Sequence, residues 1–214
     1  MKFYKIIAGA LAGFLDFSAG AFIVYLGSIF SDYQIGIPSY ILGGILGILP
    51  DFDILYIMFS KKTTFDHHQF ITHKPVPMSL LFLMLGYFLG GVFWAIIASL
   101  CLLWHYLHDT EYILGGGGIA WLWPLSKLYY SPWRIVSPEK SLMAEHKNHE
   151  KWLEEIWCKP SKTSVIEIFL GLILLLIIAQ KGLNNWRIGA FFIIVIWLFL
   201  LFLWGDNNDN SESK

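Results

Sequence analysis

Charged side chains are scarce in this chain: of its 214 residues, 14% are charged and 56% are hydrophobic. Soluble domains carry about a quarter charged residues, so the composition excludes an ordinary soluble domain and indicates an integral membrane protein. The net charge is only −1, and we expect no nucleic-acid partner, because binding to a phosphate backbone requires a basic surplus. Two cysteines, Cys101 and Cys158, offer no disulfide framework.

Long apolar runs are what the sequence has in abundance, at residues 6–30, 38–50, 77–108, 164–180 and 188–204. The run from 77 to 108 exceeds the roughly 20 residues that cross a bilayer, and Gly86, Gly90 and Gly91 lie near its middle. We therefore expect a hairpin of helices 77–89 and 92–109. The sequence predicts an all-α polytopic membrane protein, a single domain over residues 1–214 with about six short transmembrane helices.

The distribution of lysine and arginine predicts the orientation of these helices, because cytoplasmic segments are enriched in both residues. With six spans, 13 of the 15 basic residues fall on the side of the two termini, leaving Lys181 and Arg187 on the other. With five spans the split would be 7 against 8. We therefore expect a multi-pass protein of the inner (plasma) membrane with cytoplasmic N- and C-termini.

A charged segment from residue 109 to 163 is expected to be a cytoplasmic insert. Ser137, Pro138 and Glu139 have the order of a helix start, with a capping side chain, a first-turn proline and an acid. Apolar residues and histidines then recur every three or four positions, which predicts an amphipathic helix near 138–157. The polar residues 205–214 are expected to form a disordered tail.

Carboxylates and imidazoles lie at the ends of the apolar runs. An unpaired charged group is costly so close to the hydrocarbon core, and coordination of a divalent cation would offset that cost. Six of them form the predicted set of metal ligands: Asp51, Asp53, His68, His73, His105 and Asp109. Pro50 should end a helix, and in an extended segment after it both aspartates would point the same way. His105 and Asp109, four residues apart, share one helical face.

Each pair alone has a simpler interpretation, an ordinary hydrogen bond in the helix or a solvated turn after the proline. As catalytic residues we expect Asp53, His68 and His108, with His67 as a further candidate for accepting a proton. Lys74 or Arg134 could neutralise a phosphate, although solvated charges at the cytoplasmic face would explain both. Imidazoles and carboxylates without sulfur favour zinc, with manganese or iron as alternatives.

Four motifs occur in order along the chain: LPDFD at 49–53, H-x-x-x-T-H at 68–73, HYLHDT at 105–110, and G-x-x-W-L-W-P-L-S at 118–126. Together they resemble the bacterial inner-membrane-associated metal-dependent hydrolases, a family once described as LexA-binding. The resemblance covers residues 38 to about 130 and implies a multi-span helical protein with hydrolase chemistry and the ligands named above. The chain departs from the family at Gln69 and Phe70, where an Arg-Gly pair is usual, and lacks an N-terminal histidine.

A weaker resemblance is to zinc-dependent phospholipases C and single-strand nucleases, which use H-x-x-x-D and H-x-x-x-E pairs. His105 with Asp109 and His146 with Glu150 fit these patterns, although the N-terminal ligand of those enzymes is missing. For His146 and Glu150 an ordinary pair on an amphipathic helix is the simpler interpretation.

The function predicted from the sequence is a membrane-embedded, divalent-metal-dependent hydrolase. We expect it to act on a phosphoester or lipid-linked substrate at the inner leaflet, with membrane lipids as its surroundings. The alternatives are a non-enzymatic membrane protein with a structural metal site, and a divalent-metal transporter or sensor.

Overall fold

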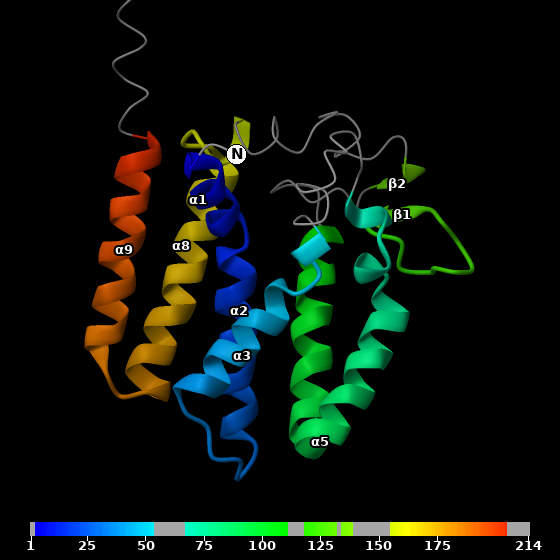
Figure 1. Ribbon diagram of the computed structural model, residues 1–214, viewed down its shortest axis with the longest axis horizontal. Coiled ribbons are helices and arrows are strands. Elements are labelled where there is room, and N and C mark those ends of the chain that lie inside the picture. The colour runs from blue at the N-terminus through cyan, green and yellow to red at the C-terminus, as the bar shows by residue number, and fades with distance from the viewer. Residues whose placement is uncertain (1–2, 54–66, 111–117, 132–133, 139–154, 205–214) are drawn as a thin grey trace, which may run out of the picture.

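The computed structural model describes residues 3–53, 67–110, 118–131, 134–138 and 155–204 (Figure 1). Most of these residues are helical, in the elements α1 (Phe3–Ala12), α2 (Phe14–Ile29), α3 (Ile37–Ile48), α5 (Pro75–Thr110), α8 (Lys162–Ile177) and α9 (Trp186–Trp204). Short helical turns are η1 (His67–Gln69), η2 (Ile71–His73) and the π-helical η4 (Ile178–Gly182). The predicted amphipathic helix lies largely in residues 139–154 and the predicted tail lies in residues 205–214, and both ranges are outside the described residues.

A small antiparallel sheet departs from the predicted all-α class. It pairs β1 (Tyr129–Ser131) with β2 (Arg134–Val136), with Tyr130 opposite Ile135. Aromatic and β-branched side chains favour strands, and the paired residues include Tyr129, Tyr130, Ile135 and Val136. This pairing was not predicted from the sequence.

Helix α5 is a hairpin, as the sequence predicts. Gly91 has φ 72° and ψ −166°, a conformation open to glycine and strained for other residues, and the helix axis reverses there (Figure 1). The two arms are in contact along their length: the Ser99 hydroxyl donates to the Ser79 carbonyl at 3.3 Å, and Gly86 packs against the backbone of Trp94. The reversal brings Pro75 and Thr110 to the same end of the protein.

Helices α2 and α3 approach each other through glycines, as the small residues of α3 lead one to expect. A Cβ atom on Gly43 would lie 2.7 Å from the carbonyl oxygen of Gly20, and one on Gly47 would collide with the carbonyl oxygen of Asp16. The main hydrophobic core forms where this pair meets α5 and α8, around Val24, Ile97 and Cys101.

Replacing Gly43 with alanine is expected to lower the unfolding temperature, because its methyl group must push α2 and α3 apart at a cost of about 1–3 kcal/mol. Gly9 provides the matched control, since a Cβ atom there meets nothing within 4 Å. The Gly9→Ala protein should keep its stability or gain up to about 1 kcal/mol from helix propensity. Thermal unfolding of both variants in one detergent checks the prediction, and equal unfolding temperatures would contradict the close packing.

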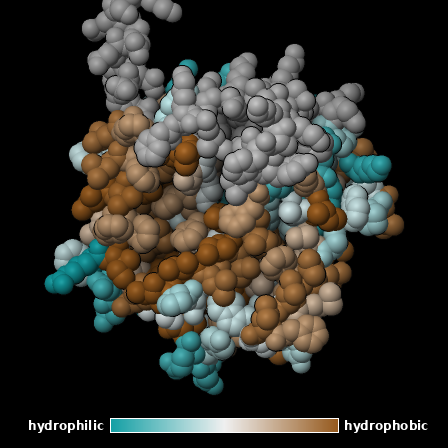
Figure 2. Space-filling model, in the orientation of Figure 1, coloured by the Kyte–Doolittle hydropathy of each residue, from teal (hydrophilic) through white to brown (hydrophobic). Residues whose placement is uncertain are grey.

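By length and composition, two helical segments of the described chain can cross a membrane, Pro75–Thr110 and Lys162–Gly182. Ile6–Ala12 and Phe14–Ile29, which meet at 41°, provide a third if the bent pair is one span. The six predicted transmembrane segments all fall on helices, and α5 contains two of them. Length and composition, however, support two or three spans, so a total of six spans remains a prediction. Hydrophobic side chains cover much of the helical surface in Figure 2, as expected for a protein in contact with lipid.

One end of the bundle holds the start of α1, the end of α3, η1, η2, the last turns of α5 and the end of α9 (Figure 1). The opposite end holds the bend at Gly91 and the turn between η4 and α9. All the segments with predicted metal ligands therefore lie at the end where the chain enters α1 and leaves α9. The assignment of that end to the cytoplasm stays a prediction.

Candidate metal centre

Five of the six predicted ligands converge at this end of the bundle. Asp51 comes from a tight turn after α3, in which the Asp51 amide donates to the Ile48 carbonyl at 3.1 Å. His68 and His73 come from the 3₁₀ turns η1 and η2. The i,i+4 spacing places His105 and Asp109 on one face of α5, and the hairpin turns that face toward the other three.

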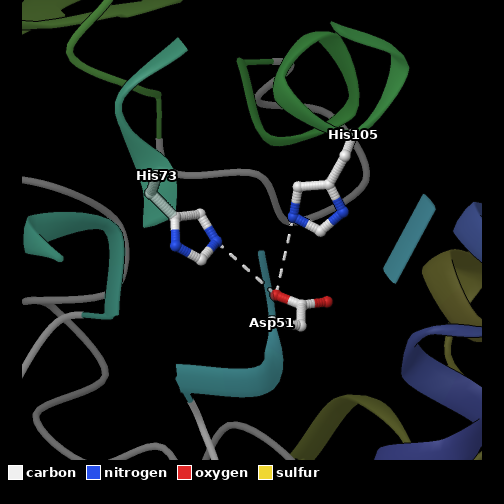
Figure 3. A group of neighbouring side chains, drawn as sticks. All are labelled: Asp51, His73 and His105. Carbon is white, nitrogen blue, oxygen red and sulfur yellow. Dashed lines mark ion pairs between the residues drawn. The ribbon is translucent and has the colours of Figure 1, made fainter. Parts of the chain in front are cut away.

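The distances between the converging atoms are short. The Asp51 Oδ1 atom lies 3.6 Å from Nε2 of both His73 and His105 (Figure 3). Asp109 Oδ2 lies 3.2 Å from His105 Nε2, 3.5 Å from His73 Nε2 and 3.7 Å from His68 Nε2. Two overlapping groups, Asp51–His73–His105 and His68–His73–Asp109, each have their donor atoms within 4.8 Å of one another.

The three histidines share one orientation, with Nε2 toward the carboxylates of the centre and Nδ1 toward an outer oxygen. His73 Nδ1 lies 2.9 Å from Asp53 Oδ2, and His68 Nδ1 lies 3.1 Å from the carbonyl oxygen of Gly118. His105 Nδ1 faces Asp16 Oδ2 at 3.6 Å. Outer acceptors of this kind place the hydrogen on Nδ1 and leave the Nε2 lone pair free for a metal ion.

The donor set fits a divalent cation. Among the described residues, His105 Nε2 and Asp109 Oδ2 are buried without a hydrogen-bond partner. Buried polar atoms of this kind are costly, and a cation would satisfy both. Ligand atoms at tetrahedral angles and about 2.1 Å from a zinc ion are about 3.4 Å apart, close to the separations measured between these carboxylate and imidazole atoms. Imidazoles with carboxylates suit zinc, manganese or iron.

The electrostatics of the centre favour proton release when a metal binds. Burial would lower the pKa of His73, but the neighbouring carboxylates of Asp51 and Asp53 outweigh it and raise the pKa to about 9. Burial would raise the pKa of Asp51, yet His105 and His73 hold it below its usual value. Since a metal ligates unprotonated imidazole, a cation that binds at neutral pH would displace the His73 proton, and its affinity would rise with pH up to about 9.

Asp53 lies outside the group of converging donors. The chain after Pro50 is a turn and not the extended segment we expected, so the two aspartates flank opposite nitrogens of His73. Asp53 Oδ2 also accepts a hydrogen bond of 2.5 Å from the Thr72 hydroxyl. The geometry makes Asp53 a support for His73, and its predicted ligand and catalytic roles stay untested.

His108 points away from the converging donors, one helical position off the face that His105 shares with Asp109. Its Nδ1 lies 3.0 Å from Asp16 Oδ1, and its Nε2 lies 3.7 Å from Glu167 Oε1. The predicted catalytic role of His108 stays untested.

Among the further candidates, Lys74 is buried and not a solvated charge. Its Nζ atom donates to the His68 carbonyl at 2.9 Å and lies 5.8 Å from the centre of the Tyr129 ring. Arg134 is exposed on β2. His67 belongs to η1 but its side chain is not described, and His146 and Glu150 lie outside the described residues.

Several supporting residues are absent from the predicted set: Asp16, Thr72, Gly118 and Glu167. A carboxylate inside an apolar run is the sequence signal for Asp16 and Glu167, since such a group needs a buried partner. Thr72 and Gly118 lie within two of the motifs, but nothing in their residue type shows that one supports Asp53 and the other accepts from His68.

Part of the chain is similar to a known membrane protein. Over 104 residues the chain is 34% identical to the inner membrane protein YbcI of Escherichia coli (strain K12). The matched segment is 44% of this chain and spans only 58% of the length of that relative. No family model and no solved structure matches the chain.

Proposed function

We propose that this chain is a bacterial inner-membrane protein that binds a divalent cation, with zinc the favoured metal. With that cation it hydrolyses a phosphoester or lipid-linked substrate at the inner leaflet. The observation that supports it best is the convergence of three imidazole Nε2 atoms on two carboxylates, with each Nδ1 facing an outer oxygen. The similarity to YbcI and the apolar helices support the location. The distribution of lysine and arginine along the sequence supports a six-span topology with cytoplasmic termini.

The five residues with converging donor atoms differ in how far their side chains are exposed to solvent. The side chain of Asp51 is 25% exposed, against 15% for Asp109 and 2% or less for His68, His73 and His105. We assign the three histidines and Asp109 to holding the cation. Asp51, at the open edge, is either a fifth ligand or the carboxylate that accepts a proton from the attacking water. The bound cation would supply Lewis acidity and lower the pKa of that water.

The position of the centre favours a substrate that lies in the membrane surface. The converging donors lie at the end of a bundle whose helices expose large apolar side chains, including Leu80 and Leu107 on the two arms of α5. A lipid or lipid-linked phosphoester can reach that depth with its apolar part still in the bilayer. Because Lys74 already donates to His68, we do not assign it to phosphate binding.

The test is turnover by the purified protein in mixed micelles, after metal removal and reloading with zinc, manganese or iron. We expect hydrolysis of at least one phosphoester in a panel that includes phospholipids, and loss of more than about 100-fold in kcat for Asp51→Asn. The matched control is Asp32→Asn, because Asp32 is exposed in the loop between α2 and α3. Metal binding with no turnover on any member of the panel would refute the hydrolase.

A structural metal site is the second candidate, and the segments that supply the donors favour it. The centre joins the turn after α3, the η1–η2 segment and the end of α5, which a cation could hold together without any reaction. Transport has less support, because it requires polar side chains along several spans. The acids inside the apolar helices, Asp16 and Glu167, instead both contact His108.

A further inference from the structure

A second buried polar cluster lies beside the metal centre, between three helices. It consists of Asp16 on α2, Trp104 and His108 on α5, and Glu167 on α8. The Trp104 indole donates to Asp16 Oδ1 at 2.9 Å, and His108 Nδ1 lies 3.0 Å and 3.1 Å from the two oxygens of the same carboxylate. Both acids are buried, with 3% of Asp16 and 4% of Glu167 exposed.

The geometry of this cluster does not suit a second cation. Asp16 contacts Nδ1 of His108 and Glu167 contacts Nε2, so the two acids lie at opposite nitrogens of one ring. A metal ion binds one nitrogen of an imidazole and needs its other donors near that same atom. The histidine therefore connects the two acids.

Asp16 extends this cluster to the metal centre. Its Oδ2 atom lies 3.6 Å from Nδ1 of His105, whose Nε2 faces Asp51 and Asp109. Among the described residues, His105 Nδ1 is buried without a hydrogen-bond partner. The separation is longer than a hydrogen bond, and a movement of under about 1 Å would close it.

Asp16 is held in place from two sides. The Trp104 indole fixes Oδ1, and His108, which Glu167 contacts from α8, lies against both oxygens. A buried carboxylate is costly unless charged or hydrogen-bonding partners surround it. Held by Trp104 and His108, Asp16 turns Oδ2 toward Nδ1 of His105, the one histidine of the centre whose outer acceptor is not yet hydrogen-bonded in the structure.

We propose that Asp16 is a positioning residue of the metal centre, which accepts the Nδ1 hydrogen of His105 and is itself held by Trp104, His108 and Glu167. The inference rests on the cation-binding part of the proposed function and not on hydrolysis. It extends the centre to α2 and α8, neither of which supplies a converging donor atom.

The test compares Zn²⁺ affinity of wild-type protein, Asp16→Asn and Glu167→Gln, by competition with a chelator. Loss of an outer acceptor weakens metal binding by about 10–100-fold, and we expect a loss in that range for Asp16→Asn. Glu167→Gln should give a smaller loss in the same direction, and it tests the inference if Asp16→Asn does not fold. Asp32→Asn, at an exposed acid, should bind like the wild type.

The Co²⁺-loaded proteins provide a readout that a purely structural role would not change. If Asp16 orients His105, the visible absorption bands of bound Co²⁺ will shift or weaken in Asp16→Asn. Unchanged affinity and spectrum in both variants, with only a lower unfolding temperature of the metal-free protein, would overturn the inference and leave the metal site standing. If the wild-type protein binds no Zn²⁺ or Co²⁺, the proposed function fails and the inference with it.

Discussion

Replacing His73 with alanine will remove most of the affinity of this protein for a divalent cation, and will cost more affinity than replacing His68. His73 belongs to both groups of converging donors, and its Nε2 lies 3.6 Å from Asp51 and 3.5 Å from Asp109. His68 belongs to only one of the two groups, and its Nε2 lies 3.7 Å from Asp109. Since an outer acceptor alone contributes about 10–100-fold, we expect a loss above 100-fold for His73→Ala.

Competition with a chelator of known Zn²⁺ affinity, together with elemental analysis of the purified protein, measures this difference. Gln69→Ala is the matched control, because Gln69 lies in the same segment with its side chain exposed. The variant must also show wild-type helix content, since His73 is wholly buried. Wild-type affinity in His73→Ala would mean that the cation, if bound, is held by a different set of residues.

The helical framework of the centre could be predicted because simple physical limits determine it. A bilayer accommodates about 20 helical residues, so a longer apolar run with central glycines must turn back. That argument predicted the hairpin of α5 and the arrival of His105 and His73 at one end. The pairing of His105 with Asp109 follows from helix geometry alone, and their separation of 3.2 Å agrees with it.

The fine positions of the two aspartates after Pro50 could not be predicted, because they depend on a few backbone angles. In an extended chain Asp51 and Asp53 would point the same way, whereas in the observed turn they lie at opposite nitrogens of His73. A proline that ends a helix permits both conformations. One local choice thus decides whether Asp53 would contact a bound cation or instead supports the His73 ring.

Contacts between distant segments set the remaining details of the centre. The sequence shows that Asp16 is an expensive residue in an apolar run, but not that His108 and His105 are its neighbours. The Gly118 carbonyl, which contacts His68, is a backbone group and has no signal in residue type. Such partners are fixed by the packing of α2 and of the segment before β1 against α5, which local patterns do not encode.

Chelating the bound cation will lower the unfolding temperature by about 10 °C, whether or not the protein is an enzyme. A ligand that binds only the folded state stabilises it by about 4 kcal/mol when its free concentration is 1,000 times Kd. In a chain of this length each kcal/mol changes the unfolding temperature by about 2–4 °C. The measurement is thermal unfolding in detergent with a chelator, and then after Zn²⁺ is restored.

The expected effect follows from the donor atoms that a bound cation would hold together. Without a cation, Asp51 and Asp109 face the same two imidazoles, His73 and His105, at 3.2–3.6 Å. The turn after α3, η2 and the end of α5 then lose the bond that joins them. The His73→Ala protein should therefore unfold at one temperature with or without chelator, and an equally large shift in that variant would show that Zn²⁺ stabilises the protein from another site.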